Sequence, residues 1–557
     1  MPVPSPSSLS NRTRFRRAAS SMDSNDNDNG CDNEITVPSV PQEPVARGRG
    51  RQRKRYGEII SALSNFSIQY NLGVISPALL LLDHCRVTNQ ADNPSLYPLS
   101  SNADSLLKSA VFLGAILGQS SMGFIGEALC GSLHLAMLVT NGIALLGTLG
   151  STLVPLVGAG DFQRAEQVYT LLAVFRAILG FGVGGKYPLG SAIRAQAAES
   201  DVECPDKKEH RAKEVAKGFF WQTPGAIMPF IVQWALLLVF GDEHSGVGRK
   251  YVTSTNKQYV ILVGLGAIPS IVMIFLSWQE LANDANQGGN CPTICRRNRG
   301  GYREVLGNRN RGQSGLAMLL GALRNREHLR KLVGTGVSWA LYDFVYYGTA
   351  FNQPEIISTV LGDGTGLVGV SWRDALIAMM GIPGVVLAIQ MMETMGGPKP
   401  LQGWGFVMIG IASLNLLIFY ASRDLIGSNI SKWGGFVSCA LLICALNWGC
   451  NVSTYVMPME VFPREVRSSM HGLSAGMGKA GALLGCLVFT QLNQISVSLT
   501  FAACVIACCL GVLVTWRFVE PPYQNTFFAD RYQSTQQQDR HHEPTSEMEP
   551  IRHEEII

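Results

Sequence analysis

Long apolar runs recur along the chain, each of roughly twenty residues, the length that an α-helix needs to cross a hydrocarbon core about 30 Å thick. Short polar stretches separate these runs. They predict twelve membrane-spanning helices, near residues 57–82, 105–127, 132–154, 166–194, 214–240, 257–279, 331–353, 373–395, 402–421, 434–458, 468–490 and 497–519. The pattern is typical of an all-α, polytopic membrane protein.

Three longer polar segments organise these spans. Residues 1–56 precede the first span, residues 281–330 follow the sixth and residues 520–557 follow the twelfth. We expect a disordered basic tail, a central loop and a second tail, all on the cytoplasmic side. Residues 57–280 and 331–519 then form two pseudo-symmetric halves of six helices each.

Composition and charge agree with a membrane protein. Of the 557 residues, 47% are apolar and 15% are charged, and the net charge is +4. The segment Arg47–Arg55 holds five arginines and a lysine directly before the first span, and the expected inner loops hold more Lys and Arg than the outer loops. This distribution predicts cytoplasmic termini. A basic cluster can also bind nucleic acid, but its place beside a span favours membrane orientation, and we expect no nucleic-acid partner.

The thirteen cysteines form no recognisable disulfide framework. Most lie inside apolar runs, where cysteine packs as a small apolar residue. Cys291 and Cys295 have the spacing Cys-x3-Cys in the central loop, but no matching second pair completes a zinc site. We therefore expect no metal and no cofactor. Residues 1–40 lack the apolar core of a cleavable signal, so we expect the first span to direct insertion.

The segment Gly180–Arg194 combines glycines with a lysine, a tyrosine and a proline inside an apolar stretch. Its first six residues fit Gly-x-Gly-x-x-Gly, a dinucleotide-binding turn that needs a preceding β-strand. The preceding run Val168–Leu179 is too long for a strand. We interpret the segment as a membrane helix whose small residues allow a neighbouring helix to approach closely. The sequence offers no other catalytic pattern, and we expect no enzyme activity.

Ionisable residues inside spans are the strongest functional candidates, because burying one near mid-bilayer costs about 2.5–3.5 kcal/mol on insertion scales. Three stand out, namely Lys186, Asp343 and Lys479. Asp343 and Lys479 lie near the middle of their spans by residue count. Lys186 lies about twenty residues into the fourth span, where a long side chain can reach water at the helix end. The alternative for Asp343 and Lys479 is a purely structural ion pair between helices.

Aromatic and amide groups accompany these charges. Trp339, Asp343 and Tyr347 recur at i, i+4 and i+8 and therefore share one helix face. Gln222 and Asn451 place amides at similar depth. A lysine charge together with N–H and O–H donors suits an oxyanion. The alternatives are core packing for the aromatic residues and interhelical hydrogen bonding for the amides.

Glu460 and Arg467 lie where the tenth and eleventh spans approach the cytoplasm. Opposite charges at helix ends can form salt bridges that close the inner side and break when the two halves rock. We expect a gating role for this pair. The alternative is a solvated loop that holds ordinary positive-inside arginines.

Five stretches together carry a family signature. They are Gly185-Lys-Tyr-Pro188, Trp339-Ala-Leu-Tyr-Asp343-Phe-Val-Tyr-Tyr347-Gly, Asn451-Val-Ser-Thr-Tyr, Glu460-Val-Phe-Pro-x-x-x-Arg467 and His471-Gly-Leu-Ser-Ala-Gly-Met-Gly-Lys479. The last stretch is the most specific. They resemble the inorganic phosphate:proton symporters of the major facilitator superfamily, over roughly residues 57–520. The resemblance implies the major facilitator fold, inorganic phosphate and protons as partners, and the plasma membrane as the location.

The resemblance also implies a binding site and two departures from the family pattern. The implied phosphate-coordinating residues are Tyr187, Gln222, Trp339, Asp343, Tyr347, Asn451 and Lys479. Lys186, which we also place at the anion site, stands where the family has an aspartate. Ile68 and Asn71 stand where it has an acidic pair. With Lys186, Asp343 and Lys479 in one site the net charge is about +1, so an anion can bind without an added proton. This puts proton coupling in question and leaves Asp343 as a candidate for it.

Two other functions stay open at the level of the sequence. The Glu-x-Phe-Pro-x-x-x-Arg motif is shared with sugar porters, so the cargo can instead be an organic anion or a sugar. The departures and the long tails are also compatible with a phosphate receptor that binds without transport. The sequence does not specify an oligomeric state.

Overall fold

The fold is known from a computed structural model, which divides the chain into two units, Met1–Arg47 and Gly48–Ile557. Both expected six-helix halves fall in the second unit, which is the subject below. The structure describes residues 44–83, 100–126, 132–157, 165–199, 207–241, 249–286, 315–354, 356, 366–422, 428–463 and 466–519. Most of the two expected tails and of the central loop lies outside the described residues, as do Cys291 and Cys295.

Within the described ranges, all regular secondary structure is helical. The first half contains α1 (Pro44–Gly73), α2 (Ile75–Asp83), α3 (Ser101–Phe124), α4 (Leu133–Val157), α5 (Ala165–Glu199), α6 (Lys207–Phe219), α7 (Gln222–Phe240), α8 (Arg249–Gly264) and α9 (Ala267–Asn286). The second half contains α12 (Arg326–Phe351), α14 (Gly366–Met379), α15 (Gly381–Thr394), α16 (Pro398–Ser422), α17 (Ser428–Asn447), α18 (Cys450–Val461), α19 (Arg467–Ile495) and α20 (Val497–Phe518), with α11 (Gly315–Arg324) preceding α12.

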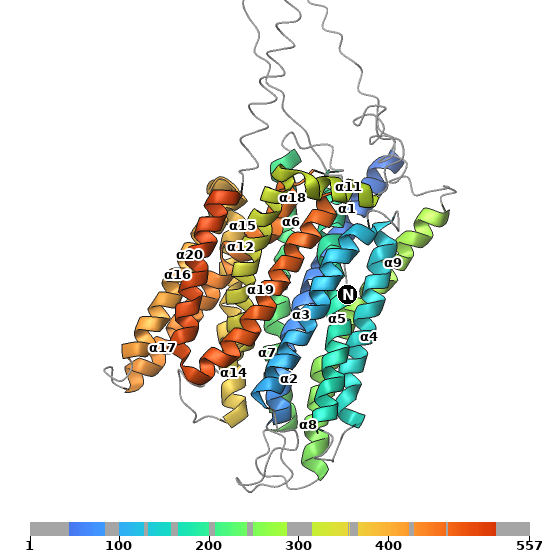
Figure 1. Cartoon of the computed structure of the whole chain (residues 1–557). Helices are drawn as coiled ribbons and strands as arrows, with labels where there is room; N and C mark the ends of the chain where they lie inside the picture. Colours follow the sequence, from blue (N-terminus) through green and yellow to red (C-terminus); the bar gives the residue numbers. More distant parts are fainter. Residues whose placement is uncertain are drawn as a thin grey trace, which may run out of the picture. The chain divides into compact units, whose positions relative to one another are not determined.

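Several of these helices continue one another across a short break. When α1 is joined to α2, α6 to α7, α8 to α9, α14 to α15 and α17 to α18, the described helices apart from α11 form twelve rods that correspond to the twelve expected spans (Figure 1). The all-α, polytopic fold expected from the hydrophobic pattern is therefore confirmed.

Nine helices of the described ranges are long and apolar enough to cross a membrane by themselves. The rods outside this set are α1–α2, α3 and α12, which match the first, second and seventh expected spans. Polar residues account for this. The segment α12, for example, begins with Arg326-Glu-His-Leu-Arg-Lys331 and carries Asp343 further along.

The first helix begins earlier than the sequence predicts. We expected the tail to extend to residue 56, but α1 starts at Pro44 and includes the basic segment. Arg and Lys are good helix formers, so a helix that the apolar part of the span stabilises can extend through them. The other domain limits stay predictions.

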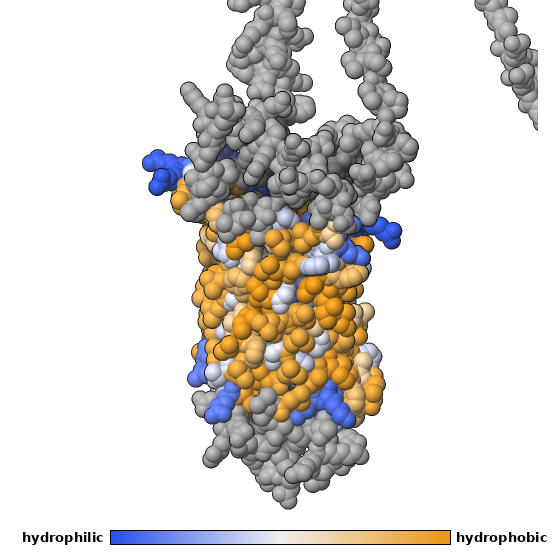
Figure 2. Space-filling view, turned by 90° about the vertical axis from the view of Figure 1, so that its right-hand side faces the viewer, coloured by the Kyte–Doolittle hydropathy of each residue, from blue (hydrophilic) through white to orange (hydrophobic). Residues whose placement is uncertain are grey.

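The surface of the rods is apolar, and their interior holds many polar side chains among the apolar ones. Large apolar side chains such as Val239, Leu513 and Leu117 are 76%, 65% and 63% exposed. Ser67, Gln119 and Ser270 are 0% exposed. Figure 2 shows one face of this belt, with hydrophilic residues at both ends of an apolar band. This distribution is what a helix bundle in lipid requires, and the protein is an integral membrane protein.

Small residues bring α3 close to two neighbours, α5 and α19. A side chain at Gly180 of α5 would overlap the backbone carbonyl of Val111 on α3, and one at Gly472 of α19 would overlap that of Gln119. The first contact confirms that the glycine-rich segment is a packed helix. The second joins the two halves, because α3 belongs to the first half and α19 to the second.

Breaks in the rods lie next to the candidate site residues. Gly449, with φ 76°, separates α17 from α18 in a backbone conformation that favours glycine. The α6–α7 break lies directly before Gln222. At the end of α1, the Arg176 guanidinium of α5 donates to the carbonyls of Asn71 and Leu72 at 2.7 and 3.2 Å. The buried arginine thus satisfies carbonyls at the helix end that the break exposes.

Candidate substrate-binding site

Lys479 of α19 is the centre of a buried polar cluster. Its Nζ donates to Asp343 Oδ2 at 2.9 Å and to Tyr347 OH at 2.9 Å. The Lys479 and Asp343 side chains are 1% and 3% exposed. Asp343 and Tyr347 are one turn apart on α12, so both face α19 as their spacing predicts. The ion pair between these helices, which the sequence leaves open as an alternative, is therefore present, and it fits both a structural role and a role in binding.

The first half reaches the same cluster through α1 and α5. Gln69 Nε2 donates to Tyr347 OH at 2.9 Å and to Gln222 Oε1 at 2.7 Å. The Tyr187 O–H donates to Gln222 Oε1 at 3.3 Å, and the Tyr187 ring centroid lies 5.2 Å from Lys479 Nζ. The cluster is thus shared between the two halves, where a change in their relative position alters it directly.

Aromatic rings close one side of the cluster. The Trp339 ring lies 6.2 Å from that of Tyr187 and 5.6 Å from that of His471, between centroids. Tyr455 contacts Tyr187 and His471 in the same edge-on manner, at 5.9 and 5.2 Å. All four side chains are buried. Rings that exclude water lower the local dielectric constant and strengthen the interactions of Lys479.

Asn451 belongs to a neighbouring amide chain rather than to the direct contacts of Lys479. Its Nδ2 donates to Asn447 Oδ1 at 3.0 Å. Thr223 Oγ1 of the first half donates to the same oxygen at 3.1 Å. Asn451 therefore hydrogen-bonds to a residue, Asn447, that forms a second polar contact between the halves.

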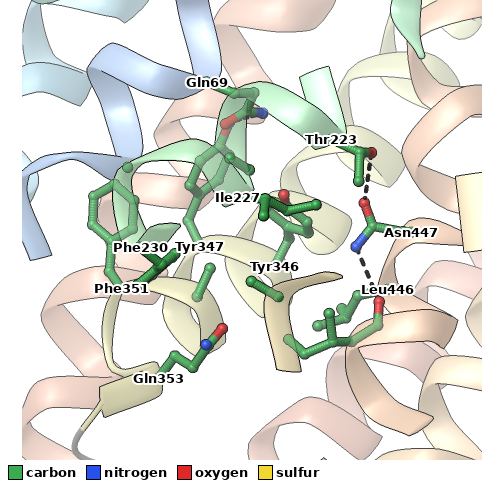
Figure 3. A pocket seen from close by; sticks show the side chains of 15 residues that line it. Gln69, Thr223, Ile227, Phe230, Tyr346, Tyr347, Phe351, Gln353, Leu446 and Asn447 are labelled. Carbon is green, nitrogen blue, oxygen red and sulfur yellow. Dashed lines mark hydrogen bonds between the residues drawn. The ribbon is translucent and has the colours of Figure 1, made fainter. Parts of the chain in front are cut away.

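A cavity lies beside the cluster and is lined from both halves. Its volume is about 40 Å³, room for a few water molecules. Figure 3 shows Gln69 and Tyr347 on one side, Thr223 and Asn447 on another, and Phe230 and Phe351 forming an apolar part of the wall. The cavity adjoins the cluster because Gln69 and Tyr347 line it.

Lys186 does not join Lys479. Its Nζ donates to Ser67 Oγ at 2.8 Å and to Ser270 Oγ at 3.0 Å, between α1 and α9. The side chain is 0% exposed, so the expectation that it reaches water at the helix end is wrong. The cluster around Lys479 then contains one lysine and one aspartate, so its local charge is neutral rather than about +1.

The expected gating pair lies at the end of the rods where α1 begins. Arg467 Nε donates to the Phe462 carbonyl at 3.2 Å, and the role of Glu460 and Arg467 as a gate stays a prediction. An ion pair between the halves is present at the same end. Lys213 of α6 and Glu393 of α15 approach to 2.9 Å.

Known membrane proteins share this sequence pattern and fold. The family described as sugar (and other) transporter matches residues 58–279, the range of the first six rods. The xylose transporter XylE from E. coli, solved in a partially occluded inward-open conformation, superposes with a TM-score of 0.60 at 18% identity and covers 84% of this chain and 98% of that chain. The chain therefore has the fold of this transporter. In transporters of this fold, substrate sites lie at the interface of two repeats near the midplane of the membrane.

Two proteins of similar sequence are inorganic phosphate transporters. Inorganic phosphate transporter PT2 of Toxoplasma gondii is 28% identical over 485 residues, which covers 86% of this chain and 74% of that protein. Inorganic phosphate transporter 1-6 of Oryza sativa subsp. japonica is 26% identical over 467 residues and covers 78% of this chain and 82% of that protein.

Four polar residues at or beside the Lys479 cluster were not predicted from the sequence. Asn65 and Gln69 lie one turn apart on α1, and Asn65 Oδ1 accepts from Gln222 Nε2 at 2.9 Å. Thr223 and Asn447 join the halves through their side chains. The sequence contains one sign of these residues, namely pairs of amide side chains four residues apart within apolar spans. The pairs are Asn65 with Gln69 and Asn447 with Asn451. Uncharged amides in a span are a weaker sign of function than ionisable groups, because they cost less to bury.

Proposed function

We propose that the protein transports inorganic phosphate across a membrane by alternating access, with the Lys479 cluster as its binding site. The observation that carries the proposal is a buried lysine whose partners come from both halves. Lys479 holds Asp343 and Tyr347 of the second half, and Gln69 of the first half donates to the same Tyr347 hydroxyl. A substrate bound here contacts both halves and is released to one side or the other when they rock.

The donors of the cluster match an oxyanion. The Lys479 ammonium supplies charge, and the hydroxyls of Tyr187 and Tyr347 with the amides of Gln69 and Gln222 supply hydrogen bonds. Binding exchanges bonds inside the cluster for bonds to the anion. Because every buried donor then has a hydrogen-bond partner both before and after binding, the exchange avoids the cost of leaving a buried polar group unsatisfied.

Asp343 favours an oxyanion that still carries a proton. An ionised carboxylate only accepts hydrogen bonds. Monobasic or dibasic phosphate has an O–H to donate to it, whereas sulfate at neutral pH has none and places two negative groups in contact. The pair of Asp343 and Lys479 therefore supports phosphate, or its close analogue arsenate, over a fully deprotonated anion.

Coupling to protons needs an acid other than one at position 186. Lys186 stands where the family that the sequence resembles has an aspartate, and the uncharged Asn71 stands where that family has another acid. A coupled proton therefore binds at another carboxylate of the spans. The expected orientation, with both termini in the cytoplasm, and the plasma membrane as the location belong to the proposal.

Uptake into proteoliposomes tests the proposal. Purified protein is reconstituted, and entry of radiolabelled phosphate is measured with unlabelled arsenate, sulfate, small organic anions or sugars as competitors. We expect phosphate entry that phosphate and arsenate suppress. If a labelled sugar enters instead and unlabelled phosphate does not suppress its entry, the cargo is a sugar and not phosphate. Phosphate binding seen by calorimetry with no flux would identify a receptor.

A further inference from the structure

Asp374 of α14 is a buried acid outside the proposed phosphate cluster. Its side chain is 0% exposed. The helix begins at Gly366, so Asp374 lies about 12 Å along it at 1.5 Å per residue. Intramembrane carboxylates of this kind mark ion or proton pathways when they face the interior of a bundle.

The partners of Asp374 leave one carboxylate oxygen unsatisfied. Gln353 Nε2 donates to the Asp374 carbonyl at 3.1 Å and to Asp374 Oδ1 at 3.5 Å. Oδ2 is buried without a hydrogen-bond partner, as is the hydroxyl oxygen of Ser371. Ser371 precedes Asp374 by three residues and therefore lies on the same face of α14. Two unpartnered buried oxygens on one face indicate a missing proton between them or a missing ligand.

The described surroundings of the Asp374 carboxylate hold no compensating cation. Among the residues that the structure describes, no Lys, Arg or His nitrogen lies within 4.0 Å of the Asp374 carboxylate. The Arg373 guanidinium stacks over the Trp372 ring at 5.8 Å. Helix α7, which packs against α14, has no ionisable side chain, and on α17 the titratable group facing Asp374 is the buried thiol of Cys439. An ionised carboxylate is strongly disfavoured in such a place, whereas a protonated one is not.

Asp374 is linked through Gln353 to the cavity beside the Lys479 cluster. Gln353, its hydrogen-bond partner, lines the cavity, and so does Ala378, one turn further along α14. Figure 3 shows Gln353 and Gln69 in separate parts of the wall. Gln353 thus connects the Asp374 carboxylate to the wall of the cavity.

We propose that Asp374 is a proton-binding site of the transport cycle. The carboxylate accepts a proton from cavity water while the cavity is open to one side, and the neutral acid donates to Ser371 as Gln353 covers it. The proton returns to water when the cavity opens to the other side. Only O–H bonds form and break. As a route for coupling, the inference rests on the proposed phosphate transport.

Infrared spectroscopy tests proton binding without phosphate. At neutral pH, wild-type protein should show the carbonyl stretch of a protonated carboxylic acid, and Asp374→Asn should lack that band. Arg373→Gln, a change at the adjacent stacked position, should retain it. Identical spectra for wild type and Asp374→Asn would overturn the proposal.

Uptake into proteoliposomes tests coupling. Wild-type uptake should rise when the medium outside is made more acidic than the lumen, and for Asp374→Asn the ratio of uptake with and without the gradient should fall to about one. Asp374→Glu should restore part of the ratio, and labelled-phosphate exchange in the absence of a gradient verifies that each variant is folded. Stimulation retained in Asp374→Asn contradicts the inference, as does stimulation by Na⁺ instead of acid. A wild type that shows the infrared band but moves no phosphate contradicts the proposed cargo and supports the proton site.

Discussion

The replacement of Asp343 by asparagine separates recognition of phosphate from simple attraction of anions. Asp343→Asn keeps the shape of the side chain and removes the charge that Lys479 Nζ contacts at 2.9 Å. Hydrogen bonds that involve a charged group contribute about 1.5–3 kcal/mol, and each 1.4 kcal/mol is a factor of about ten. We therefore expect the preference for phosphate over sulfate to fall by roughly ten- to a hundred-fold in the variant.

The assay is competition of sulfate against labelled phosphate in proteoliposomes. Asp343→Glu, which retains the carboxylate, is the matched control and should keep the preference for phosphate. Removing one partner of a buried ion pair costs about 3–5 kcal/mol, so Asp343→Asn should also melt at lower temperature and gain more than wild type from added anion. A phosphate-to-sulfate ratio equal to that of wild type would refute the reasoning.

Three further variants test separate features. Lys186→Asp should make uptake more dependent on pH, and a pH profile equal to that of wild type would count against a role for this position in the transport path. Lys213→Glu should slow phosphate exchange by a few-fold, because an exposed ion pair contributes about 0.2–1 kcal/mol. Adding Glu393→Lys restores opposite charges and should restore the exchange rate. If the double variant stays slow, the ion pair does not matter for the transport cycle. Gly472→Ala should lower the melting temperature by forcing α19 away from Gln119, at a cost of about 1–3 kcal/mol. Gly142→Ala is the control and should leave the melting temperature unchanged, because a side chain there meets nothing within 4 Å. Equal melting temperatures for the two variants would contradict the packing argument.

The rods were predictable because a membrane span is set by the length of an apolar run. Their ends were less so. The expected eighth span began at residue 373, whereas α14 begins at Gly366. Asp374 is the second residue of the expected span but lies well inside α14, so the hydrophobic pattern alone does not show how deeply this charge is buried.

The composition of the site was partly predictable. Helical spacing placed Asp343 and Tyr347 on one face of α12, as the structure has them. Residue counting gives depth along a helix but not the neighbour that a side chain meets. Lys186 and Tyr187 are adjacent in sequence, yet about 100° of helix rotation separates them, so Lys186 meets Ser67 while Tyr187 meets the Lys479 cluster.

The contacts between the two halves could not be predicted from the sequence. The hydrogen bond from Gln69 to Tyr347 joins residues 278 positions apart, and no spacing rule within one helix predicts it. Likewise the approach of α3 to α19 depends on the absence of a side chain at Gly472, which is recognisable only when the partner helix is known.

Exchange of phosphate across a membrane tests the central claim most directly. Proteoliposomes are loaded with unlabelled phosphate, and entry of labelled phosphate at a much lower outside concentration is followed over time. Alternating access at the Lys479 cluster predicts transient accumulation of label, which Lys479→Ala abolishes and which is absent from liposomes without protein. Binding of phosphate without accumulation of label in the wild type would contradict the account.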